Sequence, residues 1–331
     1  MSGLPSPDDL SRFDDFTILE TAYKTVSDHS ITTAVLIPKS LTSSETPNSP
    51  SPILLRYHGG FFIAASSLYP GFFQPWHMEL AARHSAVIVS PNYRLAPEAS
   101  IEDILRDVED HWTWLHEKLP AFVEKETAGR VSVDTGRVLV AGESAGGYLS
   151  LMTGLSHAKE VRAVAAAYPC IDFTADHYVR GPAAPTFGVA PGSIPRIVVD
   201  GHLEKVRKGE APAVVSEDSR LERGGLMFAV LHNGIFSELF PPQKQELFPL
   251  ERVKDGEKLP RGGVFVWHGK EDCVVPAAGS VKLQKTIAEA DPDLRFQLAL
   301  RDGDHGFDHH AKIDDDWMAE GFKDLVKAWL E

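Results

Sequence analysis

The segment Gly142-Glu143-Ser144-Ala145-Gly146-Gly147 contains the strongest candidate for covalent chemistry in this sequence. It directly follows the apolar run at residues 138–141 and precedes a helix-compatible stretch. A G-x-S-x-G pattern alone is weak evidence because it also arises by chance. Between a strand and a helix, however, its glycines allow a strained turn that projects the serine hydroxyl above a sheet. We therefore predict that Ser144 is a nucleophile. The alternative is a glycine-rich turn that merely packs closely.

A serine hydroxyl needs a base to remove its proton, and the base must come from another loop at the same edge of the sheet. His305 fits this role, since it lies in the turn-rich segment 302–307, directly after a predicted strand at 295–300. A surface or core histidine without catalytic function is the alternative. Two other histidines, His58 and His268, also close predicted strands but lie beside glycines.

The third group that this chemistry needs is a carboxylate that orients the imidazole and stabilises its positive charge. We favour Asp272, which follows the predicted strand at 264–267 and lies between Ser144 and His305 along the chain. A solvated acid in a turn is the alternative. Three further acids compete for the role: Glu271, Asp304 and Asp308.

The negative oxygen of a tetrahedral intermediate requires hydrogen-bond donors that are placed in advance. The segment His58-Gly59-Gly60-Phe61-Phe62 follows the apolar run 53–57 and offers backbone N–H groups. We expect an oxyanion hole at this loop, completed by the residue after the nucleophile. Its predicted members are Gly59, Gly60, Phe61 and Ala145.

Eight strand-like segments surround these motifs. Residues 16–26 and 30–38 resemble a hairpin, and six short apolar runs follow, at 53–57, 86–91, 138–141, 161–168, 264–267 and 295–300. Such continuous runs are typical of strands buried on both faces of a mostly parallel sheet. Helical periodicity occurs between them, for example at residues 101–115 with Ser100 as the N-cap, and again at 317–330. The pattern predicts an α/β fold with helices on both faces.

One interval of about ninety residues interrupts this alternation, which is too long for an ordinary crossover. We predict an inserted cap at 172–261, a catalytic core formed by 52–171 and 262–331, and an N-terminal segment 1–51 that contributes the first hairpin. The alternative is a structural excursion unrelated to substrate.

Composition and charge restrict the partners. The 331 residues include 47 Asp and Glu against 33 Lys and Arg, a net charge of −14. Nucleic acids and anionic membrane surfaces both favour a basic face, so neither is an expected partner. Only Cys170 and Cys273 could form a disulfide, and no apolar run approaches the ~20 residues that span a bilayer. We expect free thiols and a cytoplasmic protein, either a monomer or a homodimer.

Taken together, the motifs resemble the hormone-sensitive-lipase-like branch of the α/β-hydrolases. The matching residues are Tyr57–Phe61, Asn92–Glu98, Gly142–Gly147, Gly269–Pro276 and Gly303–Phe307. The resemblance implies an α/β-hydrolase fold with a mostly parallel eight-stranded sheet, and a cap built from the N-terminal segment 1–51 and the insertion. It further implies a serine carboxylester hydrolase without a metal or organic cofactor. It also implies a triad of Ser144, Asp272 and His305, in the chain order of that fold.

This chain departs from the family pattern at Phe61, which stands where the family usually has a third glycine. Backbone donors still serve there if Phe61 tolerates the required angles; a positive φ would alter the hole. Aromatic residues of the interval and of the loops below it suggest an apolar pocket for a neutral, moderately hydrophobic ester. The predicted substrate-binding residues are Phe62, Tyr93, Glu143, Phe228 and Phe236.

Two other functions remain open. The same triad would also support thioester release, lactone opening or cyclisation of a biosynthetic intermediate. A non-catalytic small-molecule receptor is the alternative from another class, although such receptors lack the catalytic histidine.

Overall fold

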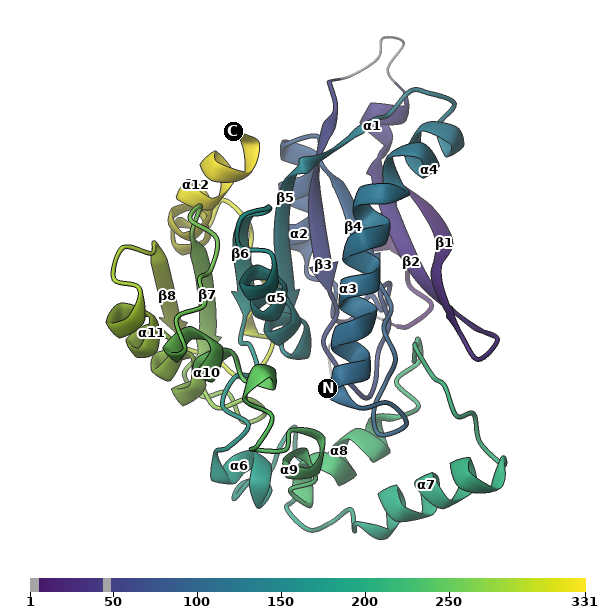
Figure 1. Ribbon diagram of the computed structural model, residues 1–331, viewed down its shortest axis with the longest axis vertical. Coiled ribbons are helices and arrows are strands. Elements are labelled where there is room, and N and C mark those ends of the chain that lie inside the picture. The colour runs from purple at the N-terminus through teal and green to yellow at the C-terminus, as the bar shows by residue number, and fades with distance from the viewer. Residues whose placement is uncertain (1–5, 44–48) are drawn as a thin grey trace.

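The computed structural model describes residues 6–43 and 49–331, so part of the Ser/Thr/Pro-rich stretch at 40–52 lies outside the described residues. One eight-stranded sheet runs through the molecule in the order β1-β2-β4-β3-β5-β6-β7-β8 (Figure 1). The pairs β1/β2 and β2/β4 are antiparallel, and all other neighbours are parallel. The strands are β1 (Phe16–Val26), β2 (His29–Pro38), β3 (Ser51–Tyr57), β4 (Val87–Pro91), β5 (Val133–Glu143), β6 (Val161–Ala167), β7 (Val264–Gly269) and β8 (Phe296–Arg301). The predicted fold class is confirmed.

Burial follows a strand's position in the sheet. Every residue of β3, β4 and β7 is buried, as their apolar sequences predict. The prediction for the last run was wrong: β8 is an edge strand with no buried residue, and Leu300 remains 37% exposed. An apolar run therefore marked the strand correctly but not its position in the sheet.

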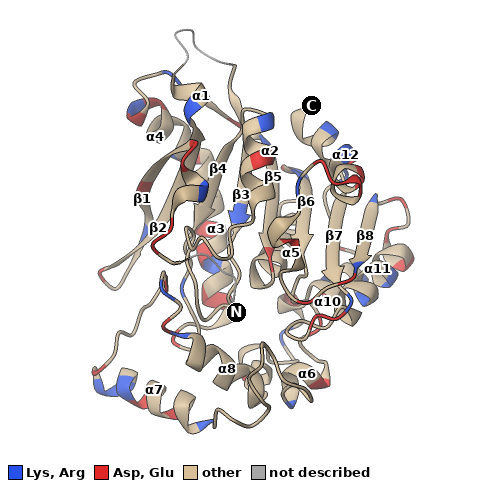
Figure 2. Cartoon of the chain, turned by 180° about the vertical axis from the view of Figure 1, so that it is seen from behind, with Lys and Arg blue, Asp and Glu red and all other residues tan. Residues whose placement is uncertain are grey.

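Helices cover both faces of the sheet and enclose two separate cores. On one face lie α3 (Ile101–Glu117), α4 (Leu119–Glu126), α5 (Ala145–Ser156) and α11 (Ala278–Ala290) (Figure 1). On the other lie α2 (Pro75–Arg83) and α12 (Asp316–Leu330), in front of the sheet in Figure 2. Ser100 caps α3 in a reciprocal capping box with Asp103, as the N-cap prediction required.

The long interval between β6 and β7 forms a layer beyond the carboxyl ends of the parallel strands (Figure 1). It contains α6 (Asp176–Val179), α7 (Ile197–Lys208), α8 (Gly224–His232) and α9 (Phe236–Leu239). We call these four helices and their connections the cap. The next helix, α10 (Pro249–Lys254), packs against α5 and α11 instead, so the interval is not uniformly cap.

The remaining elements are short. They are α1 (Lys39–Thr42) and three 3₁₀ turns, η1 (Ser11–Phe13), η2 (Gln245–Leu247) and η3 (Phe307–His310). Asp8 in the N-terminal segment forms an ion pair with Arg220 of the long interval, 2.7 Å between their side chains. Among the described helices, none is both long and apolar enough to cross a membrane.

Candidate active site

Ser144 lies at the turn that joins β5 to α5. Its backbone has φ 57° and ψ −116°, a conformation that few non-glycine residues adopt. Gly146 allows this turn because a Cβ atom at that position would collide with the carbonyl group of Tyr57 at the end of β3. The predicted strand–turn–helix geometry is therefore present, and α5 starts in direct contact with the neighbouring strand.

The loops after β7 and β8 bring the predicted base and acid together. His305 Nδ1 lies 2.8 Å from Asp272 Oδ2. The other carboxylate oxygen, Oδ1, accepts the N–H groups of Val274 (2.9 Å) and Val275 (2.7 Å), which hold the side chain in place. Burial alone would raise the pKa of Asp272. The charge of His305 and hydrogen bonds from His268 and His305 outweigh it and hold that pKa below its ordinary value.

The three competing acids have other partners. Glu271 accepts the Gly303 N–H (2.6 Å), and Asp304 accepts the N–H groups of Cys273 and His305. Asp308 is buried beneath the site, where it accepts hydrogen bonds from Trp267 and Tyr168. Within the described chain, Asp272 is thus the only carboxylate bonded to the His305 ring.

The Ser144 hydroxyl points toward Cys170, with 3.8 Å between Oγ and Sγ. Among the described contacts it forms no hydrogen bond with His305, but Ser144 and His305 line the same cavity, of about 370 Å³. Burial raises the pKa of the Cys170 thiol to about 12, so it is a neutral neighbour rather than a competing nucleophile.

The loop after β3 contributes backbone donors to the cavity. Gly60 (φ 101°) and Phe61 (φ 54°) both have positive φ. The condition under which we expected an altered oxyanion hole at Phe61 is therefore met. No described residue accepts the N–H of either Gly60 or Phe61. The Ala145 N–H belongs to the first turn of α5, where helix donors lack partners within the helix.

Gly59 also lines the cavity, and no described backbone carbonyl accepts its N–H group in a hydrogen bond. Its role as an oxyanion donor therefore stays a prediction. Gly59 packs against the nucleophile, with no room for a side chain between it and Ser144.

His58 and Tyr93 brace the same loop. The Tyr93 hydroxyl donates to the His58 carbonyl (2.7 Å), and the two rings stack with their centres 4.2 Å apart. Burial lowers the pKa of His58 to about 3, so the ring is neutral. These contacts fix the backbone on which Gly60 and Phe61 lie.

Glu143 forms a buried ion pair with Arg56 of β3. Arg56 also donates to the carbonyls of Ser67 and Phe72, and its guanidinium lies 4.0 Å from the centre of the Phe73 ring. Burial raises the pKa of Glu143 to about 7 although Arg56 opposes the shift. The pair anchors the carboxyl end of β5, directly before the nucleophile, to β3.

Of the five predicted substrate-binding residues, only Glu143 lines the cavity. The other four belong to the packing around it. Phe62 packs against Tyr148, Phe173 and Phe240, and Tyr93 braces the His58 loop. In the cap, Phe236 contacts Phe61 and Phe228 contacts His232. Aromatic side chains near the site were therefore expected correctly, but their inward or outward orientation was not.

Several cavity residues were not foreseen. The apolar ones include Phe72, Leu221 and Met227, and the polar ones are Gln74, Tyr168, His309 and His310. Tyr168 directly follows β6 at the same sheet edge as Ser144, a position that could have indicated it. Gln74 precedes α2 with no motif around it.

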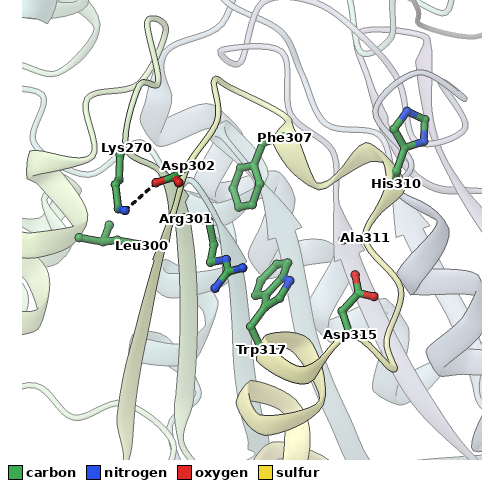
Figure 3. Close-up of a pocket in the computed structure, with 9 residues that line it drawn as sticks. All are labelled: Lys270, Leu300, Arg301, Asp302, Phe307, His310, Ala311, Asp315 and Trp317. Carbon is green, nitrogen blue, oxygen red and sulfur yellow. Dashed lines mark hydrogen bonds and ion pairs between the residues drawn. The ribbon is translucent and has the colours of Figure 1, made fainter.

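A second hollow, of about 410 Å³, shares only His310 with this cavity (Figure 3). Lys270 pairs with Asp302 at its upper edge (2.6 Å), and the Arg301 guanidinium lies over the Trp317 ring. Its lining includes neither Ser144 nor Asp272 nor His305. The candidate active site is therefore the cavity at Ser144.

Comparison with known proteins agrees with this geometry. Residues 54–188 match a family model described as alpha/beta hydrolase fold. A probable carboxylesterase, M8, from Phoma sp. is 27% identical over 321 residues, covering 96% of this chain and 98% of that protein. The non-reducing polyketide synthase Preu6 of Preussia isomera is 26% identical over 314 residues, which cover 86% of this chain but 13% of the synthase.

Solved structures show the same architecture. An esterase from Pyrobaculum calidifontis superimposes with a TM-score of 0.60 at 19% identity, covering 98% of this chain and 89% of that one. The motifs, the sheet order and the relatives lead to one assignment. The chain has the α/β-hydrolase fold, is similar to that family over residues 54–188, and is a carboxylesterase-like hydrolase.

Proposed function

We propose that this enzyme hydrolyses neutral, moderately hydrophobic carboxylic esters through an acyl-enzyme on Ser144. The observation that carries the proposal is the 2.8 Å contact between His305 and Asp272 beside a cavity that also contains Ser144. Asp272 accepts a hydrogen bond from the Nδ1–H group of the imidazole, which leaves Nε2 free to act as the base.

The steps follow from this arrangement. The Ser144 hydroxyl turns from Cys170 toward His305 Nε2, gives up its proton and attacks the ester carbonyl carbon. The Gly60, Phe61 and Ala145 N–H groups stabilise the oxyanion, and the imidazolium returns its proton to the leaving alcohol. Water then attacks the acyl-enzyme with His305 again acting as the base, and the carboxylic acid leaves.

The cavity wall supports the substrate class. No lysine or arginine of the described chain lines the cavity, and its one acidic residue, Glu143, is paired with Arg56. The apolar lining residues are Phe61, Ala64, Phe72, Phe187, Leu221, Met227 and Val274. Such a wall binds uncharged groups by burial of apolar surface.

Ser144→Ala tests the mechanism. We expect its kcat/KM for aryl esters to fall by about 10⁴- to 10⁶-fold while its thermal unfolding stays that of the wild type. Cys170→Ala is the matched control beside the nucleophile and should keep reactivity toward a fluorophosphonate, which Ser144→Ala should lose. An unchanged rate in Ser144→Ala would end the proposal. Equal rates across acyl esters of graded length would contradict an apolar pocket.

A second candidate function rests on the similarity to a segment of the polyketide synthase Preu6. An enzyme with this triad would also release or cyclise a thioester-bound biosynthetic intermediate, with an internal hydroxyl in place of water. Product analysis on a thioester that carries such a hydroxyl separates the two functions: a free acid supports hydrolysis, and a lactone supports cyclisation.

A further inference from the structure

One wall of the active-site cavity is backed by a row of hydrogen-bonded polar groups that the proposed mechanism does not use. Asp308 lies deepest, followed by Tyr168, Gln74 and His309. Tyr168, Gln74 and His309 all line the cavity that contains Ser144. The residues come from the end of β6, the start of α2 and the loop after β8, so the fold brings them together from distant parts of the chain.

The direction of each hydrogen bond can be derived from the buried end. Trp267 Nε1–H donates to Asp308 Oδ2 (2.9 Å), and the Tyr168 hydroxyl donates its single proton to Asp308 Oδ1 (3.0 Å). The Tyr168 oxygen is then left as an acceptor. Gln74 must therefore direct its NH₂ group toward Tyr168 (3.4 Å) and its carbonyl oxygen toward His309 (2.9 Å from Nδ1).

The end of this row fixes the tautomer of His309. Because Gln74 Oε1 can only accept, His309 Nδ1 carries the proton and Nε2 carries a lone pair. Burial, assisted by the charge of Arg12, lowers the pKa of His309 to about 4, so the ring is neutral near pH 7. No described residue forms a hydrogen bond with His309 Nε2.

The wall thus presents an acceptor where the rest of the cavity is mainly apolar. Resting on the proposed ester hydrolysis, we propose that His309 Nε2 accepts a hydrogen bond from a hydroxyl group of the substrate. The enzyme would then prefer hydroxylated esters over equally sized esters that lack the donor. His309 is a specificity residue in this proposal and takes no part in bond cleavage.

Matched pairs of substrates test this preference. The probes are ethyl 2-, 3- and 4-hydroxybenzoate and the corresponding hydroxyphenyl acetates, each compared with its methyl ether. They place the donor on the acyl or on the alcohol side of the ester. We expect at least one hydroxy isomer to exceed its methyl ether in kcat/KM by about 3- to 10-fold, the effect of one net hydrogen bond.

For each variant, we compare kcat/KM for a hydroxy ester with kcat/KM for its methyl ether. This hydroxy/methoxy ratio is the readout, because a general loss of activity lowers both values of a pair equally. His309→Phe should bring the ratio to about one, and His309→Gln, which retains an acceptor, should restore part of it. Gln74→Leu should lower the ratio because the tautomer is no longer fixed. His84→Phe, at a half-buried histidine that does not line the cavity, is the matched control and should keep the wild-type ratio.

Two results would overturn the proposal: no preference for any hydroxy isomer in the wild type, or an unchanged ratio in His309→Phe. Failure of the ester-hydrolase function itself looks different, because all esters would then be turned over equally by Ser144→Ala and by the wild type.

Discussion

The catalytic core and the cap are held together in different ways. In α5 of the core, eleven of twelve residues are buried, whereas Val199 is the only buried residue in α7 of the cap. Ile197 and Val198 at the start of α7 are 69% and 39% exposed. Helix α8 of the cap, in contrast to α7, has seven of its nine residues buried. The reacting groups belong to the core, and Leu221 and Met227 of the long interval supply cavity wall from the cap.

A few specific contacts join the two regions. Glu98, buried in the loop after β4, binds both Arg223 (2.6 Å) and His202 (2.7 Å). Phe173 and Phe240 stack with their ring centres 3.7 Å apart, and both contact Phe62 of the core. The difference teaches that truncation of packed core residues should lower stability, and truncation of cap residues in the cavity wall should alter the preference for acyl-chain length.

After the loss of Ser144 itself, the largest expected effect concerns the acid of the core. Asp272→Asn should lower kcat by about 10³- to 10⁴-fold, because an amide no longer fixes the imidazole in the tautomer that accepts the serine proton. Steady-state hydrolysis of a short aryl ester measures the change. The matched control is Glu271→Gln next to it, which does not touch the imidazole and should cost less than tenfold. Equal losses in both variants would mean that Asp272 has been assigned wrongly.

Two methionines compare the regions directly. Met152→Ala in the core should lower the free energy of unfolding by about 2–5 kcal/mol and leave the preference for acyl chain length unchanged. Met227→Ala in the cap should enlarge the cavity and shift that preference to longer chains by a few-fold. Thermal or denaturant unfolding and an acyl-chain series measure the two effects. The comparison fails if Met152→Ala also changes the preference.

The smallest expected effect concerns acid sensitivity of the core. Burial lowers the pKa of His111 in α3 to about 3, compared with about 6.5 in an unfolded chain. The unfolded chain therefore takes up a proton below pH 6.5 that the folded protein refuses. The stability contribution is complete above pH 6.5 and is lost as the pH falls, by about 2 kcal/mol at pH 5.

His111→Gln removes this term and can still bond to Thr33, the partner of His111 Nε2. Denaturant unfolding between pH 7 and pH 5 should show a smaller loss of stability for the variant than for the wild type. If stability falls with pH equally in the variant and the wild type, the pKa of His111 is not lowered in the folded state.

The sequence predicted the strands and the site residues of the core better than it predicted the residues of the cap that line the cavity. Its strands are short apolar runs, and Ser144, Asp272 and His305 each directly follow or closely trail such a run, so the strand ends place them. The apolar runs do not indicate which strand lies at the edge of the sheet, because the run that forms the exposed edge strand β8 resembles those of the buried strands. The close packing of Gly59 against Glu143 and Ser144 is likewise a contact that no local pattern reveals.

The cavity wall was the least predictable part. Whether an aromatic residue faces the cavity or the packing behind it depends on helix orientation, which composition does not specify. Phe236 packs on Phe61 rather than forming the wall, whereas Phe187 does line it. Gln74 and His309 meet only because α2 and the loop after β8 converge, 235 residues apart in the chain.

The absence of a side chain at Gly146 has a consequence for how this enzyme can change. Since the first turn of α5 touches the end of β3, the attacking oxygen and the loop that receives the developing charge form one rigid part. Their relative angle of approach is set when the sheet folds. Laboratory evolution toward new esters should therefore accumulate changes in the covering helices and spare this junction.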